Sequence, residues 1–464
     1  MSKFKEKYIG TRDFYMRVLA IAVPMIVQNL ITNFVSMLDN IMVGKIGTAQ
    51  MSGVSIANQY IFIFNITMFG AVSGAGIFGA QFFGKGDSEG QKYTFRFRII
   101  LAILLTIAAA VIFGLFGSPL INLFLNDNDS PEVIASTLEH GTKYLRIMIL
   151  GLLPFAVGQA YSSVVRECGE THIPMIGSMV AIGINLILDY GLIFGRLGMP
   201  QLGVEGAAIA TVIAKYIEAS VVIVWVHTHH SRNKYIVGAY KSMYIPGWLV
   251  KDIVIKGLPL LFNEFLWSLG MSIIAQSFSI RGIEVVAARN IASTLVNLFN
   301  VVFTQLGAAI GILVGAELGA GKLKEARSTA EKTMVFALFI TCILAVVLIP
   351  VSFWFPKIYN TEKSVQDLAT FYLLVQALAL PMWSYTNSCY FILRSGGKTG
   401  ITFMFDFIFT WFVSIPLAFF LARYTDMDIH LLMIIVTYSE IIKVVVGYFM
   451  VRSDIWINNI VDKQ

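Results

Sequence analysis

The sequence predicts an all-α polytopic membrane protein, with twelve transmembrane helices in two pseudo-symmetric six-helix bundles. Of its 464 residues, 57% are hydrophobic and only 13% are charged, and the mean hydropathy is +0.74. A soluble domain carries roughly 25% charged residues, so there are too few polar groups here to cover a water-soluble body of this size. Apolar runs such as 99–117, 333–350 and 431–451 reach the roughly 20 residues that span a bilayer. An internal repeat near half the chain length supplies the third observation.

Six spans are expected in each half of the chain, from the apolar runs and the residues that interrupt them. The first half gives 14–43, 51–83, 95–117, 134–165, 172–195 and 204–227. The second half gives 249–279, 286–318, 333–354, 364–393, 400–422 and 429–451. Four prolines fall inside these spans, where they disrupt helical hydrogen bonds: Pro24, Pro154, Pro259 and Pro381.

The two halves repeat one pattern. Leu19–Pro24 aligns with Val254–Pro259, and Gly84-x-Gly86 aligns with Gly319-x-Gly321. Such repeats are a common construction of transporters, with the ligand path between the halves. The polar stretch 230–248 predicts a cytoplasmic linker, which leaves an amino-terminal lobe at 1–229 and a carboxy-terminal lobe at 249–464. Because each half has an even number of spans, the repeats are expected to be parallel.

Loop charges predict the orientation. Lysine and arginine concentrate in alternate loops, as at Lys85, Lys322 and Lys398, while the opposite loops carry few. By the positive-inside rule the basic loops and both termini are cytoplasmic, in a multi-pass protein of the plasma membrane. The same rule explains the net charge of +6 without a nucleic-acid partner. No cleavable signal peptide is evident, and three scattered cysteines indicate neither a disulfide nor a metal site.

Ionisable groups inside spans are functional candidates, because a charge in the bilayer is costly. Asp39 lies about 25 residues into the first span, in the outer half of the bilayer. Asn185 and Asp189 share one face of the fifth span, and Thr211 of the sixth lies at similar depth. These four oxygen donors predict a cation-coupling site that suits Na+ or a shared proton. The alternative is that they cap helix ends or pair with polar neighbours.

The second half carries a different acid. Glu264 follows Pro259 near the middle of the seventh span, whereas the matching position of the first half is Asn29. Glu264 is expected to face a cavity between the lobes, as a substrate contact or second ion site, and Asn33 is a further candidate for that cavity. Spacing of i and i+3 favours internal ion pairs for Lys215 with Glu218 and for Glu440 with Lys443. Asp406, near the start of its span, is expected to be interfacial.

The chain resembles the multidrug and toxic compound extrusion (MATE) family over essentially its full length. The resemblance rests on Val23–Asn29, Asp39–Gly44, Gly79-Ala-Gln81, Arg166-x-x-Gly-Glu170, Asn185–Asp189 and Gly206–Thr211, in this order and spacing. It implies two six-helix bundles facing each other in a V, which exchange a cation for substrate by rocking. Asp39, Asn185, Asp189 and Thr211 match the amino-terminal cation site of DinF-like and archaeal members, and Glu264 matches a glutamate of the NorM-like branch. The tenth helix departs from that branch, since Trp383–Asn387 contains no carboxylate.

The leading hypothesis is therefore a monomeric secondary antiporter that exports organic, mainly cationic, drugs or toxic metabolites in exchange for Na+ or H+. Alternating access is expected, with Pro24 as the hinge beside Asp39 and no cofactor other than the coupling ion. One alternative is a flippase for lipid-linked sugars, which needs a basic cavity for pyrophosphate. Another is a receptor that does not transport. An enzyme is not expected, because the sequence has no phosphate-binding loop, no H-E-x-x-H and no nucleophile motif in a plausible context.

Overall fold

A computed structural model describes residues 7–125 and 130–462, and the described residues form helices without any strand. In the first half the helices are α2 (Arg12–Gly44), α3 (Thr48–Lys85), α4 (Ser88–Asn122), α5 (Pro131–Glu167), α6 (His172–Phe194) and α7 (Val204–Thr228), followed by a short 3-10 turn η1 (Lys234–Ile236). The second half has α8 (Gly247–Ser279), α9 (Ile283–Gly319), α10 (Leu323–Trp354), η2 (Phe355–Ile358), α11 (Lys363–Ser395), α12 (Thr399–Phe409), η3 (Thr410–Ser414), α13 (Ile415–Tyr424), α14 (Ile429–Tyr438) and α15 (Ile441–Arg452).

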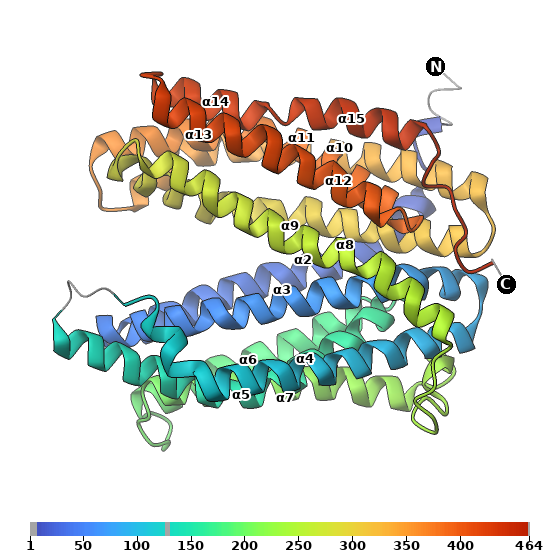
Figure 1. The fold of residues 1–464 in the computed structure, drawn as a ribbon, viewed down its shortest axis with the longest axis horizontal. Coiled ribbons are helices and arrows are strands. Elements are labelled where there is room, and N and C mark those ends of the chain that lie inside the picture. Colours follow the sequence, from blue (N-terminus) through green and yellow to red (C-terminus); the bar gives the residue numbers. More distant parts are fainter. Residues whose placement is uncertain (1–6, 126–129, 463–464) are drawn as a thin grey trace. The chain divides into compact units, whose positions relative to one another are not determined.

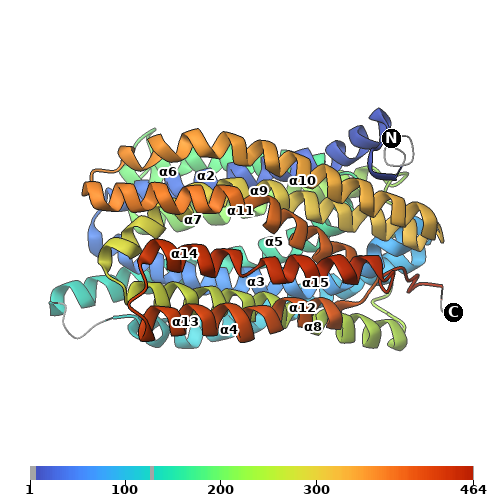
Figure 2. The ribbon, with the colours of Figure 1, turned by 90° about the horizontal axis from the view of Figure 1, so that it is seen from above.

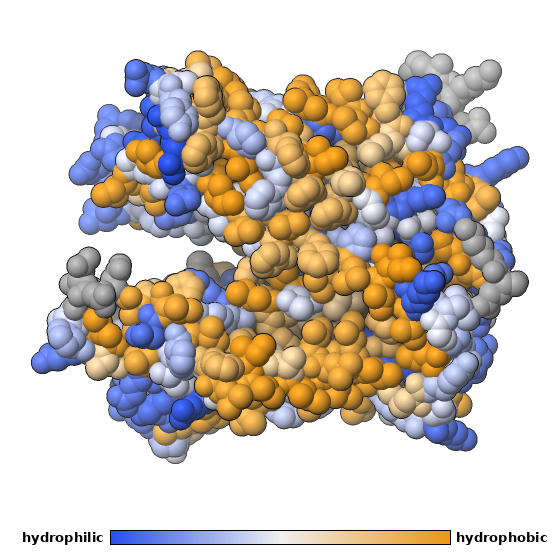
Figure 3. Space-filling view, viewed as in Figure 1, coloured by the Kyte–Doolittle hydropathy of each residue, from blue (hydrophilic) through white to orange (hydrophobic). Residues whose placement is uncertain are grey.

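Twelve helical segments among the described residues are long and apolar enough to cross a membrane, which confirms the predicted fold class. Large apolar side chains lie on the outer surface: Leu115 is 71% exposed and Phe412 is 68% exposed. Exposure of this kind over whole helices indicates contact with lipid. In Figure 3 the helix ends carry most of the hydrophilic side chains, while the stretches between them are mainly apolar.

The chain divides into two compact units. The amino-terminal unit comprises Val27–Gly79 and Asp87–Ile253, and the carboxy-terminal unit comprises the described residues of Met1–Ile26, Ala80–Gly86 and Val254–Gln464. The helices α2 and α3 therefore each contribute residues to both units. The lobe boundaries at 229, 230–248 and 249 remain a prediction from the sequence repeat.

In the amino-terminal unit, α4 packs on α5, α5 on α7 and α7 on α6, and these helices run along one another in Figure 1. One apolar core contains residues of all six helices from α2 to α7, among them Met68, Leu145 and Ile193. A second core lies under the segment after α7 and includes Phe95, Tyr161 and Tyr235. These cores hold α6 and α7 against each other along their length, which fixes the polar residues that both helices present.

In the carboxy-terminal unit, α11 packs against α9, α10, α14 and α15, an arrangement visible in Figure 2. The main core includes Leu348, Leu373 and Leu380, and a smaller core includes Val314 and Trp456. The first turns of α2 pack on α9 and α10 through residues such as Ala22 and Ala309.

Two of the expected spans are not continuous α-helices. The eleventh contains the π-helical turn η3 between α12 and α13. Pro416, at the start of α13, has no N–H for the carbonyl four residues earlier, and a wider turn accommodates that loss. The twelfth is interrupted at Ser439 and Glu440. The Ser439 hydroxyl donates to the Val436 carbonyl, which competes with the regular helical bond.

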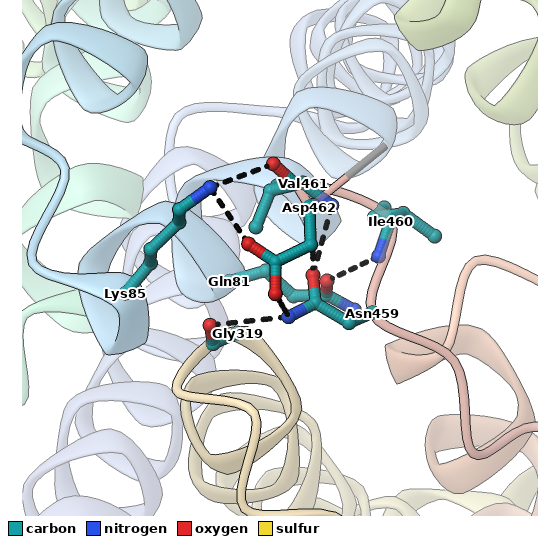
Figure 4. A network of polar contacts seen from close by, with 7 residues as sticks. All are labelled: Gln81, Lys85, Gly319, Asn459, Ile460, Val461 and Asp462. Carbon is teal, nitrogen blue, oxygen red and sulfur yellow. Dashed lines mark hydrogen bonds and ion pairs between the residues drawn. The ribbon is translucent and has the colours of Figure 1, made fainter. Parts of the chain in front are cut away.

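The residues after α15 are attached to the carboxyl end of α3 within the carboxy-terminal unit (Figure 4). The Gln81 amide donates to the Ser395 and Asn458 carbonyls at 3.0 and 3.2 Å and accepts from the Ile460 N–H at 2.9 Å. The Lys85 ammonium lies 2.7 Å from the Asp462 carboxylate. A Cβ on Gly319 would lie 1.9 Å from the Gln81 carbonyl oxygen, so only glycine allows α9 to approach α3 this closely.

Candidate functional site

The predicted cation-coupling residues lie in the amino-terminal unit. Asp39 comes from α2, Asn185 and Asp189 from α6, and Thr211 from α7. Asp189 is 1% exposed and Asn185 is 5% exposed, while Asp39 and Thr211 are partly buried. The i and i+4 spacing places Asn185 and Asp189 on one face of α6. The side chains of Asp39 and Asn185 both interact with Asp189, so the structure brings these three residues together.

The acid pair has unused hydrogen-bonding capacity. Neither carboxylate oxygen of Asp189 has a hydrogen-bond partner of regular geometry among the described residues, and the same holds for Asp39 Oδ1 and Asn185 Nδ2. Buried polar atoms are normally satisfied, and an unsatisfied charged group costs more than a neutral one. Two neighbouring carboxylates also repel each other when both are ionised. This arrangement therefore favours the binding of a proton or a small cation.

Thr211 supplies a neutral oxygen beside the Tyr144 hydroxyl, which is within electrostatic reach of the acid pair. Its hydroxyl donates to the Ala207 carbonyl at 2.9 Å, which leaves the oxygen lone pairs available as acceptors. Small residues allow α7 to approach its neighbours here. A Cβ on Gly206 would lie 2.6 Å from the Leu192 carbonyl oxygen of α6, and a Cβ on Gly151 would lie 3.2 Å from the Val212 side chain. Glycines at these crossings thus set the position of Thr211.

Tyr144 and Asn58 adjoin these candidate residues, although the sequence did not point to them. Tyr144, on α5, is 5% exposed, and its hydroxyl donates to Asn58 Oδ1 of α3 at 3.3 Å. The same hydroxyl lies beside Thr211 and within electrostatic reach of Asp39 and Asp189. A tyrosine inside an apolar span needs a polar partner for its hydroxyl. The sequence therefore predicts that the Tyr144 hydroxyl has a polar partner, but it does not show that this partner is Asn58.

The donor set suits a proton or a small, hard cation. The described residues contain no group of three or more His, Cys, Asp or Glu side chains arranged to hold a metal. What they offer is two carboxylates with neutral amide and hydroxyl oxygens, which are hard ligands. Such a site fits an ion that is bound and released as cargo.

Glu264 occupies a separate polar cluster, in the carboxy-terminal unit. It is partly buried on α8, and its Oε1 accepts a hydrogen bond of 3.4 Å from the Tyr390 hydroxyl. The neighbouring Asp406 of α12 accepts from Asn263 Nδ2 at 3.1 Å and pairs with the Lys443 ammonium. Asp406 is 9% exposed and has two partners, so it is buried within the unit, while its interfacial depth in the membrane stays a prediction. Lys443 pairs with Asp406 because α12 packs on α15, a contact between spans that spacing along one helix does not reveal.

The remaining candidates lie on α2. Asn33 is exposed and is not among the residues of either cluster described above. Pro24 lies inside α2, two residues before the boundary between the compact units at Ile26 and Val27. The expected pair of Lys215 and Glu218 is confirmed, with the ammonium 2.9 Å from Glu218 Oε2.

A protein-family model described as MatE matches residues 24–191 and 259–420, which together make up most of the chain. A probable multidrug resistance protein NorM of Thermotoga maritima is 24% identical over 416 residues, covering 89% of this chain and 86% of that protein. The corresponding NorM protein of Bacillus subtilis is 23% identical over 426 residues, covering 90% and 91%.

Solved structures show the same fold. A Vibrio cholerae MATE transporter, VcmN, superposes with a TM-score of 0.84 at 18% identity, covering 96% of this chain and 98% of that one. An outward-facing multidrug resistance MATE family transporter of the MOP superfamily gives a TM-score of 0.82 at 17% identity, with 94% of each chain covered.

Proposed function

The chain belongs to the MatE family of multidrug efflux transporters, and from that premise we propose that it is a secondary active antiporter. It exports organic, mainly cationic, drugs or toxic metabolites in exchange for Na+ or H+, and it works by alternating access as a monomer in the plasma membrane with both termini in the cytoplasm. The family is one of membrane transporters and not of enzymes. The gradient is sufficient, since one charge crossing 100 mV provides about 2.3 kcal/mol.

The acid pair is the observation that carries this proposal. Asp189 is almost fully buried, and neither of its carboxylate oxygens has a hydrogen-bond partner of regular geometry among the described residues. Asp39, Asn185 and Thr211 add oxygen atoms from three helices. A coupling ion that enters this site neutralises the carboxylates and removes their repulsion. Coupling requires that the ion bind one conformation more tightly than the other, so the site changes when the transporter switches.

The hinge for that change is Pro24. It lies on the same helix as Asp39, and α2 passes from one compact unit to the other directly after it. Ion binding at Asp39 therefore acts on a helix that belongs to both units. Glu264, with Tyr390 beside it, offers a negative charge to a cationic substrate, and Asn33 is a second candidate contact.

The test is the Asp39→Asn variant in proteoliposomes loaded with a fluorescent cationic dye, under an imposed Na+ or H+ gradient. Asparagine keeps the shape of the side chain and removes its charge, so gradient-driven efflux is expected to fall to the level seen without a gradient. The matched control is Asp87→Asn, because the Asp87 side chain caps α4 through the Gly90 N–H and asparagine caps a helix equally well.

Comparison of the Na+ and H+ arms identifies the coupling ion. Gradient-driven efflux by Asp39→Asn at the wild-type rate would refute the proposal. Dye movement that ignores both gradients in the wild-type protein would instead favour a flippase or a receptor.

A further inference from the structure

A second polar chain adjoins the acid pair in the amino-terminal unit. Lys215 follows Thr211 by one turn on α7, so both side chains lie on one face of that helix. The Lys215 ammonium is 2.9 Å from Glu218 Oε2, and it also acts electrostatically on the Asp39 carboxylate. Lys215 is thus a positive charge shared between Glu218 and the candidate coupling site.

Glu218 is itself held in place from three other helices. Its second oxygen, Oε1, accepts from the Ser178 hydroxyl of α6. Ser178 in turn accepts from the Gln28 amide of α2 at 2.7 Å, and Gln28 Oε1 accepts from Arg166 Nη2 of α5 at 3.0 Å. Gln28 and Ser178 are 8% and 3% exposed. A buried and connected network of this kind fixes the position of Lys215, whereas a surface ion pair does not.

The charges in this region do not balance. Asp39, Asp189 and Glu218 contribute three carboxylates, while Lys215 and Arg166 contribute two cations. Among the described residues, α5 and α6 pack most extensively against α7; the ionisable groups that they add here are Tyr144, Arg166 and Asp189. The nearby Arg98 and Glu167 form a separate pair at 2.8 Å and cancel each other. One negative charge is left, and burial of an uncompensated charge is costly.

We propose that Lys215 is the resident counter-cation of the coupling site and limits that site to one monovalent cation in each transport cycle. This inference rests on the proposed antiport function and adds its stoichiometry. With Lys215 and Arg166 in place, one negative charge remains among the three carboxylates, and one H+ or one Na+ neutralises it. Without the ammonium, two cations are needed, so Lys215 determines how many ions the protein exchanges for each substrate.

Membrane potential distinguishes the two stoichiometries. Exchange of one cation for one monovalent dye such as ethidium moves no net charge, whereas exchange of two cations moves one. Wild-type dye efflux from proteoliposomes is therefore expected to be insensitive to a potential set with K+ and valinomycin. In Lys215→Met, the ratio of dye concentrations across the membrane at which net efflux stops is expected to change about tenfold for about 60 mV of membrane potential.

The matched control is Lys143→Met, which removes exposed pairs with Glu139 and Glu205 in the same unit and leaves the buried charges unchanged. Lys215→Arg keeps the charge and is expected to remain insensitive to potential. A voltage-insensitive Lys215→Met protein with active, ion-driven efflux would overturn the inference, even if Asp39→Asn confirms the antiport function. Loss of the Asp39→Asn effect would instead refute the function itself.

Glu218→Gln tests the same charge count if Lys215→Met does not reach the membrane. Two cations then face two carboxylates, and no net negative charge remains for a coupling ion to neutralise. Stimulation of efflux by the Na+ or H+ gradient is expected to fall at least about tenfold. Wild-type stimulation in Glu218→Gln would overturn the inference.

Discussion

Tyr144 connects the aromatic interior of the amino-terminal unit to its charged site. The ring is part of the apolar core that joins α2 to α7, while the hydroxyl reaches Asn58 and lies beside Thr211. A phenol is a donor as well as an acceptor, so it can donate to an ionised carboxylate and can turn its oxygen towards a bound cation. Tyr144 is therefore suited to stabilise the site both before and after the ion binds.

Tyr144→Phe is expected to weaken ion binding without unfolding the protein, because the ring and its packing remain. The loss of one hydrogen bond of about 1 kcal/mol corresponds to a roughly fivefold higher ion concentration for half-maximal efflux. Tyr60→Phe is the matched control, since Tyr60 donates to the Leu120 backbone carbonyl in the same unit. Equal ion dependence of the Tyr144 variant and the wild type would remove Tyr144 from the site.

The sequence indicated both acids of the site and the neutral Asn185 and Thr211, but it did not indicate Asn58 or Tyr144. Asp39 and Asp189 are conspicuous because an acid inside an apolar span needs an explanation. Asn58 and Tyr144 carry no charge, and their importance depends on which helices pack together. The partners of Asp406 were not predicted for the same reason, since Asn263 and Lys443 lie on other helices. Position along one span does not specify a neighbour on another.

At the scale of elements, α2 combines three features, two of which it shares with α8. It contains an internal proline, it crosses from one compact unit to the other, and it carries an acid of the candidate ion site. Pro24 lacks the N–H that would bond to the carbonyl one turn earlier, which makes bending at this point less costly. Of these features, the sequence predicted the proline and the acid, whereas the boundary at Ile26 depends on packing.

Pro24→Ala is expected to slow efflux because it restores a helical hydrogen bond at the hinge. A barrier raised by about 1 kcal/mol lowers the maximal rate about fivefold, while the ion concentration for half-maximal efflux stays near the wild-type value. Pro350→Ala is the matched control, since Pro350 lies inside α10 within one compact unit. Wild-type rates in Pro24→Ala, or equal slowing by both variants, would rule out Pro24 as the hinge.

Most helix boundaries could be predicted from the lengths of the apolar runs and from the residues that interrupt them. The irregular turns within the helices could not. The π-turn η3 and the break at Ser439 lie inside continuous apolar stretches that hydropathy alone treats as single helices. The attachment of the residues after α15 to Gln81 also could not be predicted from the sequence. It depends on backbone carbonyls of α11 and of the terminal segment, and any sequence provides those groups.

Over the whole molecule, the two halves share a scaffold and differ in their buried charges. The prolines Pro24 and Pro259 both lie inside the first helix of their halves, and the family model matches each half. The acid pair lies in the amino-terminal unit, whereas Glu264, Asp406 and Lys443 form the polar cluster of the carboxy-terminal unit. Asp406 already has a lysine partner, whereas neither carboxylate oxygen of Asp189 has a hydrogen-bond partner of regular geometry among the described residues.

This asymmetry predicts that Glu264 serves the substrate and not the coupling ion. Glu264→Gln is expected to raise the dye concentration for half-maximal efflux about tenfold, because one interaction of a charge with the cationic dye is lost. Stimulation by the ion gradient is expected to persist. Dye titrations at fixed gradient, and ion titrations at fixed dye, separate the two effects, with the exposed Glu362→Gln as the control. Loss of ion stimulation in Glu264→Gln, with dye affinity unchanged, would place an ion site in the carboxy-terminal unit and contradict the division of labour between the halves.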